Sequence, residues 1–367
     1  MKIGIITMHR VINYGSALQA FALQYELEKL GHEVEIIDYI FPLNNNSLWD
    51  KLIFFIRRKA YLLRIGKLFS KTKEEYFREF SNSFIKKSEQ SYNQEDLMKN
   101  PPLYDLYMVG SDQVWNPRWT EKDTSFLLSF IENGIKTSYA TSFTVSHLDE
   151  EYTSVYKKFL SEFKHITVRE DSGRRIVKEL TGRNAECVCD PTMLLTAKEY
   201  VQLAQSSKIH IKGDYILVYI LTYMYNPYPD VNSIIATISQ NLSMPTVYLD
   251  GNKYTIYDKT CKTISEVGPC EFLWLFCHAS FVVTSSYHGC IFASIFSKPL
   301  IAITDSDCND DRMVSLLNKL EVPNSMIQYN SNISLNEDIN TYIPNQEKLH
   351  EFSSFSKNVL QNMLLNL

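Results

Sequence analysis

The first 39 residues contain a strand, a loop, a helix and a second strand, and this order restricts the possible folds more than any other feature. An apolar run predicts a buried strand at Ile3–Thr7, and residues 17–30 have apolar side chains at helical spacing. A second strand is predicted at Glu33–Tyr39, after Gly31, which suits a helix end. Such a unit forms a parallel sheet with a right-handed crossover. The loop at residues 8–16 lacks the G-x-G-x-x-G pattern, so no dinucleotide site is predicted.

A second unit of this kind begins at Phe281–Thr284, a short apolar run that predicts a strand. The polar turn Ser285–Gly289 follows it, and then come a short helix and another strand near residues 298–303. The first N–H groups of a helix lack partners, and the helix dipole is positive there, so such a turn suits an anion. A phosphorylated small molecule or a nucleotide is the expected ligand.

Strands and helices alternate along most of the remaining chain. The alternation up to about residue 190, and again over residues 215–303, predicts two α/β halves with a cleft between them. The expected fold class is therefore α/β, with two Rossmann-like domains at residues 1–195 and 196–345 and a C-terminal helix at 346–367. Ligands of open α/β sheets bind outside the carboxyl ends of the strands, which is where the polar turns fall.

Composition restricts the class of partner. The chain has 37 Lys and Arg against 42 Asp and Glu, a net charge of -5, which argues against a general nucleic-acid binder. Its seven cysteines are scattered without paired C-x-x-C units, which indicates reduced thiols in the cytoplasm. No apolar run reaches transmembrane length, and the sequence opens with a strand rather than a signal peptide. The aspartates at 305, 307, 310 and 311 lack the glycine of a calcium loop, so a solvated loop and no metal are expected.

Residues 48–71 have a composition of their own. Aromatic and aliphatic side chains are mixed with lysine and arginine, and Asp50 is the only acid. A cationic, aromatic-rich helix of this kind can lie in a membrane interface, here the inner face of the plasma membrane. It can equally pack on its own domain with a solvated basic face, so both expectations stay open.

Six short motifs follow one another along the chain. They are Asn13-Tyr14-Gly15 with Leu18-Gln19-Ala20, Val109–Asn116, Ser138-Tyr139-Ala140, Val168–Ser172, Asp190–Leu195, and Ser286–Gly289 with Phe292-Ala293 and Lys298-Pro299. In this order the chain resembles the polysaccharide pyruvyl transferase family, from residue 2 to about 325. The resemblance implies a GT-B-like fold and transfer of pyruvate from phosphoenolpyruvate onto two hydroxyls of a sugar, oligosaccharide or lipid-linked saccharide. The products would be a cyclic ketal and phosphate, and no cofactor is implied.

Two residues are the main candidates for the donor side. His288 is expected to bind the donor and transfer a proton, because an imidazole titrates near neutral pH; a histidine that only caps its own helix is the alternative. Arg169 is expected to clamp phosphate or carboxylate, and an ion pair with its acidic neighbours in the sequence is the alternative. Weaker candidates for this side, several of which could simply cap a helix or lie in a solvated turn, are Ser285, Ser286, Gly289, Lys298 and Arg312.

The acceptor side is expected at the strand ends of the first half. Asp112 is the candidate for activating a sugar hydroxyl, with a turn-forming aspartate as a nearly equal alternative. Trp115 and Asn116 are expected to supply an aromatic platform and a polar edge for the sugar. Asn13 and Gly15 are expected to shape the cleft through close backbone approach. His9 is a candidate second acid or base, although a loop histidine without such a role is commoner.

Two other functions stay open. A GT-B glycosyltransferase would bind the diphosphate of a nucleotide sugar at the same turn and hold its ribose through an acid such as Asp305. A non-catalytic component of a polysaccharide assembly complex, anchored by residues 48–71, would have no need for His288, Arg169 and Asp112 together.

Overall fold

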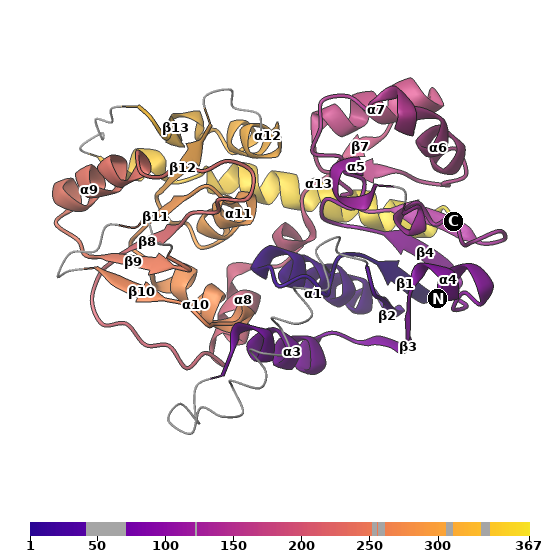
Figure 1. Cartoon of the computed structure of the whole chain (residues 1–367), viewed down its shortest axis with the longest axis horizontal. Coiled ribbons are helices and arrows are strands. Elements are labelled where there is room, and N and C mark those ends of the chain that lie inside the picture. Colours follow the sequence, from indigo (N-terminus) through magenta and orange to yellow (C-terminus); the bar gives the residue numbers. More distant parts are fainter. Residues whose placement is uncertain (42–70, 122, 252–254, 256–260, 306–310, 332–337) are drawn as a thin grey trace, which may run out of the picture.

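The computed structural model describes residues 1–41, 71–121, 123–251, 255, 261–305, 311–331 and 338–367. It contains two parallel sheets, each flanked by helices, and a long C-terminal helix that runs across both halves (Figure 1). The expected α/β class is therefore confirmed. The predicted helix at 48–71, apart from Lys71, and Asp307 and Asp310 of the acidic run lie outside the described residues. None of the helices described is long and apolar enough to cross a membrane.

The N-terminal sheet has the strand order β3-β2-β1-β4-β5 with all neighbours parallel. Its strands are β1 (Lys2–Ile6), β2 (Glu33–Tyr39), β3 (Lys87–Tyr92), β4 (Leu106–Val109) and β5 (Ile135–Ser138). A short pair, β6 (Thr167–Val168) and β7 (Glu186–Cys187), joins it through isolated bridges from Thr137 and Thr141. The strand order reverses between β1 and β4, so a ligand crevice is expected at their carboxyl ends.

The helices of this half are α1 (Tyr14–Lys29), α3 (Lys73–Phe84), α4 (Gln94–Lys99), α5 (Pro117–Thr120), α6 (Glu150–Leu160) and α7 (Asp171–Thr181). Successive strand residues face opposite sides of a sheet. Ile3 and Ile5 of β1 accordingly belong to the apolar cluster shared with α1, whereas Ile6 belongs to the cluster on the other face. Burial on both faces explains why β1 is continuously apolar.

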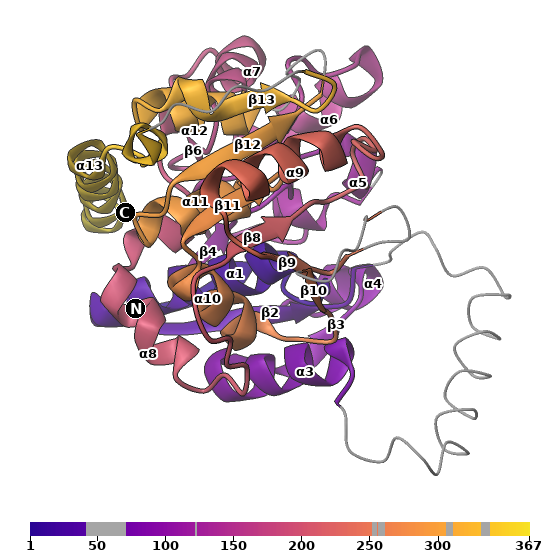
Figure 2. The same cartoon turned by 90° about the vertical axis from the view of Figure 1, so that its left-hand side faces the viewer.

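The C-terminal sheet has six parallel strands in the order β10-β9-β8-β11-β12-β13. They are β8 (Ile216–Tyr219), β9 (Thr246–Leu249), β10 (Lys262–Ile264), β11 (Phe281–Thr284), β12 (Leu300–Thr304) and β13 (Met326–Gln328). Its helices are α8 (Ala197–Ala204), α9 (Val231–Leu242), α10 (Pro269–His278), α11 (Tyr287–Ile295) and α12 (Asp311–Lys319). One face packs on α9 and the other on α10 and α11 (Figure 2). Here the strand order reverses between β8 and β11.

Helix α1 begins at Tyr14, three residues before the start predicted from the sequence. Asn13 is the cap, because its side chain accepts a hydrogen bond from the Ser16 N–H. The sequence Asn-Tyr-Gly-Ser is typical of turns, but its asparagine caps a helix here instead. The first turn of α1 therefore reaches the crevice, and Gly15 and Ser16 lie on it.

The two halves meet along α1, α10 and the C-terminal helix α13 (Gln346–Leu365). Tyr14 stacks on Phe272 of α10 with ring centroids 4.7 Å apart, and its hydroxyl donates to Asp250. Ser356 of α13 accepts a hydrogen bond from the Cys189 N–H. One apolar cluster includes residues of both halves, so the two halves share a packed junction. The division of the chain at residues 195 and 345 stays a prediction.

Candidate functional site

His288 lies in the first turn of α11, directly after the carboxyl end of β11, and reaches the N-terminal half. Ser286 caps α11 by accepting a hydrogen bond from the Gly289 N–H. The imidazole lies against α1, where a Cβ built on Gly15 would come within 2.0 Å of His288 Nδ1. The missing side chain at Gly15 therefore lets the imidazole pack directly on the opposite half of the molecule.

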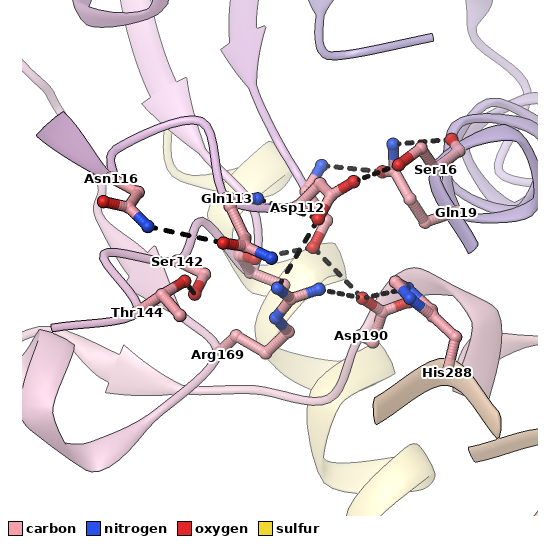
Figure 3. Close-up of polar contacts among 12 residues, drawn as sticks. Ser16, Gln19, Asp112, Gln113, Asn116, Ser142, Thr144, Arg169, Asp190 and His288 are labelled. Atoms are coloured by element: carbon pink, nitrogen blue, oxygen red, sulfur yellow. Dashed lines mark hydrogen bonds and ion pairs between the residues drawn. The ribbon is translucent and has the colours of Figure 1, made fainter. Parts of the chain in front are cut away.

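Arg169 and Asp190 form a fully buried ion pair beside this imidazole (Figure 3). Arg169 Nη1 lies 2.6 Å from Asp190 Oδ2, and His288 Nε2 lies 3.5 Å from the same oxygen. Asp190 Oδ1 accepts hydrogen bonds from the backbone N–H and the hydroxyl of Thr192. Burial acts to raise the pKa of Asp190, but His288 and Arg169 outweigh it and hold that pKa well below its usual range. Asp190 is thus a fixed negative charge between the Arg169 guanidinium and the His288 imidazole.

Asp112 approaches Arg169 from the turn after β4. Its Oδ1 lies 3.7 Å from Arg169 Nη2, and its Oδ2 accepts a 2.5 Å hydrogen bond from the Ser16 hydroxyl. The Gln113 N–H donates to Asp112 Oδ1. Asp112 has a φ of 73°, in the left-handed region that aspartate tolerates better than most residues. The ends of β4, β6 and β7, the first turn of α1 and the start of α11 therefore meet at one polar cluster (Figure 3).

Three buried nitrogen atoms of this cluster make no hydrogen bond to any residue that the structure describes. They are Arg169 Nε, Arg169 Nη2 and His288 Nε2. A buried donor without an acceptor costs about 1–3 kcal/mol, and more when it is charged. An anion that accepted these hydrogen bonds would remove that cost. The cluster consequently has the properties of an anion site that is built into the protein.

A cavity of about 180 Å³ opens next to the cluster, at the carboxyl ends of β8, β11 and β12. Ser285, Tyr287 and Arg312 line it from the C-terminal half and Arg118 from the N-terminal half. Tyr287 connects cavity and cluster, because the Arg169 guanidinium lies 4.7 Å and the Arg312 guanidinium 5.4 Å from its ring centroid. Asp305 also lines the cavity, as the one acidic side chain among the lining residues described.

Trp115 is not at the surface, which corrects the prediction that it forms a sugar platform. Its side chain is fully buried, and its indole N–H donates to the Phe126 carbonyl. The rings of Phe143 and Phe163 lie 5.2 Å and 5.8 Å away. The residue is therefore part of the core of the N-terminal half.

Several other predicted residues shape the backbone around the site. Asn13 and Asn116 are helix caps whose side-chain oxygens accept backbone N–H groups. Ser285 exchanges hydrogen bonds with the backbone of Leu221, which ties the end of β11 to the end of β8. Gly289 packs against Thr284, where a Cβ would come within 2.3 Å of the threonine hydroxyl.

Two predicted residues lie away from the cluster. Lys298 precedes β12 and is therefore at the amino edge of the parallel sheet, opposite to the site, where burial lowers its pKa. Lys298, which precedes Pro299, therefore lies at the wrong edge of the sheet to bind the donor. His9 pairs with Asp38 at 2.8 Å and lines another cavity with Arg10.

Asp190 is the site residue that sequence reasoning missed. In the sequence it stands only as the first residue of the motif Asp190–Leu195, and no role was assigned to it. An aspartate at the same sheet edge as Arg169 could have been paired with it, because neighbouring parallel strands end side by side. Among the described residues no group of three or more His, Cys, Asp and Glu side chains could hold a metal ion.

Comparisons with known proteins show the family and the fold of the chain. The family model described as polysaccharide pyruvyl transferase matches residues 13–307, which is most of the chain. No curated protein matches.

Solved structures resemble the whole fold. A UDP-GlcNAc 2-epimerase from Methanocaldococcus jannaschii, in complex with UDP-GlcNAc and UDP, is 14% identical with a TM-score of 0.53, and the match covers 100% of both chains. The UDP-GlcNAc 2-epimerase from Neisseria meningitidis is 10% identical with a TM-score of 0.53 and the same coverage. The S. aureus MnaA–UDP structure is 12% identical with a TM-score of 0.55, covering 99% of this chain and 95% of that one. The fold is therefore GT-B-like, as expected.

Proposed function

The chain belongs to the polysaccharide pyruvyl transferase family, and we propose that it transfers pyruvate from phosphoenolpyruvate to a sugar. The two hydroxyls that react would belong to a surface polysaccharide or its lipid-linked precursor, and the product would be a cyclic ketal. The reaction would take place in the cytoplasm, and contact of residues 48–71 with the membrane that bears the acceptor is part of the same proposal.

The observation that supports the proposal best is the buried guanidinium of Arg169 beside His288. The two side chains together have three nitrogen atoms that make no hydrogen bond to a described residue. Phosphoenolpyruvate has a phosphate and a carboxylate, which match such donors and the further cation Arg312. The adjoining cavity of about 180 Å³ is below the roughly 300–1,000 Å³ of sites for drug-sized ligands, which favours a small donor over a nucleotide sugar.

The residues can be given roles in a balanced reaction. His288 would protonate C3 of phosphoenolpyruvate, and the first sugar hydroxyl would add to C2 while Asp112 accepts its proton. The bond between C2 and the phosphate oxygen then breaks, and the second hydroxyl adds to C2 and closes the ring. The two sugar hydroxyls release two protons. One of them restores the proton that His288 gave to C3, and the other leaves with the phosphate. Arg169 and Arg312 would hold the anionic groups, and Asp190 would orient Arg169 and His288.

Thermal unfolding with phosphoenolpyruvate and with a panel of nucleotide sugars tests the proposal. Phosphoenolpyruvate at a hundred times its Kd should add about 2.7 kcal/mol of stability, a Tm rise of roughly 5–11 °C for a unit of 150–250 residues. His288→Ala should lose this shift and all ketal formation, whereas His147→Ala, whose side chain is 78% exposed, should keep both. A strong shift with a nucleotide sugar and none with phosphoenolpyruvate would establish the glycosyltransferase alternative instead. No shift with either would favour the non-catalytic alternative.

A further inference from the structure

Two large aromatic side chains from opposite halves of the molecule meet beside the cavity of about 180 Å³ that the proposed function assigns to the donor, the donor cavity. Trp119 lies on α5, which follows β4, and Tyr223 lies in the segment after β8. Their ring centroids are 6.5 Å apart in an edge-to-face arrangement, yet the two residues are 45% and 52% exposed. Met224, 47% exposed, lies beside Tyr223 in the sequence. Single exposed apolar residues are normal in proteins, but a contiguous group at a cleft marks a binding surface.

The polar edge of Trp119 is already held by the protein. Its indole N–H donates to Gln113 Oε1 at 3.0 Å, and Asn116 Nδ2 donates to the same oxygen at 3.3 Å. The Gln113 N–H in turn donates to Asp112 Oδ1 at 2.9 Å. The indole is thereby fixed in orientation and tied to Asp112, while nearly half of its surface stays open.

The other ring is tied to the donor cavity. Tyr223 and Met224 line that cavity together with Arg118, the neighbour of Trp119 in the sequence, and with Arg312. The aromatic pair therefore lies between the cavity on one side and the turn of Asp112 and Gln113 on the other. A ligand placed on the pair would have both within reach of its edges.

We infer that Trp119 and Tyr223 form the platform on which a pyranose ring of the acceptor stacks; this inference rests on the proposed function. A pyranose has apolar C–H faces and a polar hydroxyl edge. The face of an aromatic ring is electronegative and attracts the polarised C–H bonds of the sugar. A sugar on the platform has its apolar face covered and its hydroxyl edge free for Asp112 and the donor. This is the role that the sequence assigned to Trp115.

Binding and kinetics of Trp119 variants test the inference. The probes are methyl glycosides of common hexoses and N-acetylhexosamines, which contain no aromatic group. We expect Trp119→Ala and Tyr223→Ala each to raise both the Kd and the KM for the glycosides about tenfold. Trp119→Ala should leave the KM for phosphoenolpyruvate unchanged. Phe355→Ala is the matched control, because Phe355 is 47% exposed on α13 and lines a different cavity. Circular dichroism checks that each variant is folded.

Trp119→Phe separates stacking from positioning. It keeps an aromatic ring but loses the N–H that binds Gln113, so glycoside affinity should stay within about threefold of the wild type if stacking is the cause. A Trp119→Phe variant as weak as Trp119→Ala would overturn the inference and make Trp119 a positioning residue for Gln113. Unchanged glycoside binding in Trp119→Ala, or no binding of any glycoside to the wild type, would also overturn it. Glycoside binding that depends on Trp119 in a protein that transfers no pyruvate would uphold the platform and reject the proposed reaction.

Discussion

Replacing Asp190 with asparagine should destabilise the N-terminal half strongly, because the change removes one charge from a fully buried cluster. The asparagine keeps a side-chain oxygen that can still accept the hydrogen bonds from Thr192. The substitution removes only the negative charge. Arg169 then loses its nearest counter-charge, which lies 2.6 Å from its Nη1, and its side chain has no contact with solvent. His288 loses the carboxylate oxygen 3.5 Å from its Nε2.

The magnitude follows from the burial. Breaking a buried ion pair by removing one partner costs about 3–5 kcal/mol, because the other charge stays in the protein uncompensated. For a folding unit of 150–250 residues this corresponds to a fall in Tm of roughly 6–20 °C. Asp112 limits the loss to the lower part of this range, because its Oδ1 stays 3.7 Å from Arg169 Nη2. Asp190→Ala should cost about 1 kcal/mol more, since it also removes the cap of the 3-10 helix Pro191–Leu194.

Urea titration and thermal unfolding measure both variants against a matched control. Asp171→Asn also removes an aspartate that pairs with cations, but the Asp171 side chain is 47% exposed and the change should cost no more than about 1 kcal/mol. The double variant Asp190→Asn with Arg169→Gln should lose less stability than the sum of the two single variants. A loss under about 1 kcal/mol in Asp190→Asn, or strict additivity in the double variant, would refute the argument from a buried pair.

Two further predictions concern the same cluster. The pKa of Asp190 is lower in the folded protein than in the unfolded chain, where it is about 3.9. The stability that the ionised carboxylate contributes is therefore fully present above about pH 3.9 and is lost as the pH falls through the folded-state pKa. The gap in unfolding free energy between wild type and Asp190→Asn should therefore be constant from pH 8 to about pH 5 and narrow only below about pH 4; narrowing near pH 6 in urea titrations would contradict this assignment. Gly15→Ala should displace the His288 ring and lower kcat for ketal formation about a hundredfold, as misplacement by about 1 Å does elsewhere. Gly31→Ala, at a φ of 86° with open space around it, should lower Tm without lowering kcat.

The local pattern of the chain was enough to predict the sheet elements and the turns that hold the site. Glu33–Tyr39 and Phe281–Thr284 are strands with the predicted bounds. Apolar residues buried on both faces of a parallel strand leave a continuous signal in the sequence. The rule that ligands bind at the carboxyl ends of strands then located His288, Arg169 and Asp112, and the structure brings all three together.

The errors arose where a residue type has several uses. Trp115 and Trp119 are four residues apart next to the same polar turn, and nothing in the local sequence says which of them faces the core. The path of the chain after β4 decides it, because Trp115 packs on Phe143 and Phe163, which come from later in the sequence. Lys298 was a weaker candidate for the donor side, with a solvated turn as the alternative. Helix α11, which separates it from β11, places it at the opposite edge of the sheet.

The sequence by itself determined the α/β class, the two sheets and the polar turn around His288, because periodicity and capping are local properties of the chain. Tertiary structure alone decided that Gly15 receives the imidazole, that Asp190 neutralises Arg169 and that Trp119 meets Tyr223. Each of these contacts joins residues that are far apart in the chain or come from different strand ends. Their energies depend on burial and on distances of a few ångströms, which arise only when the two halves pack against each other.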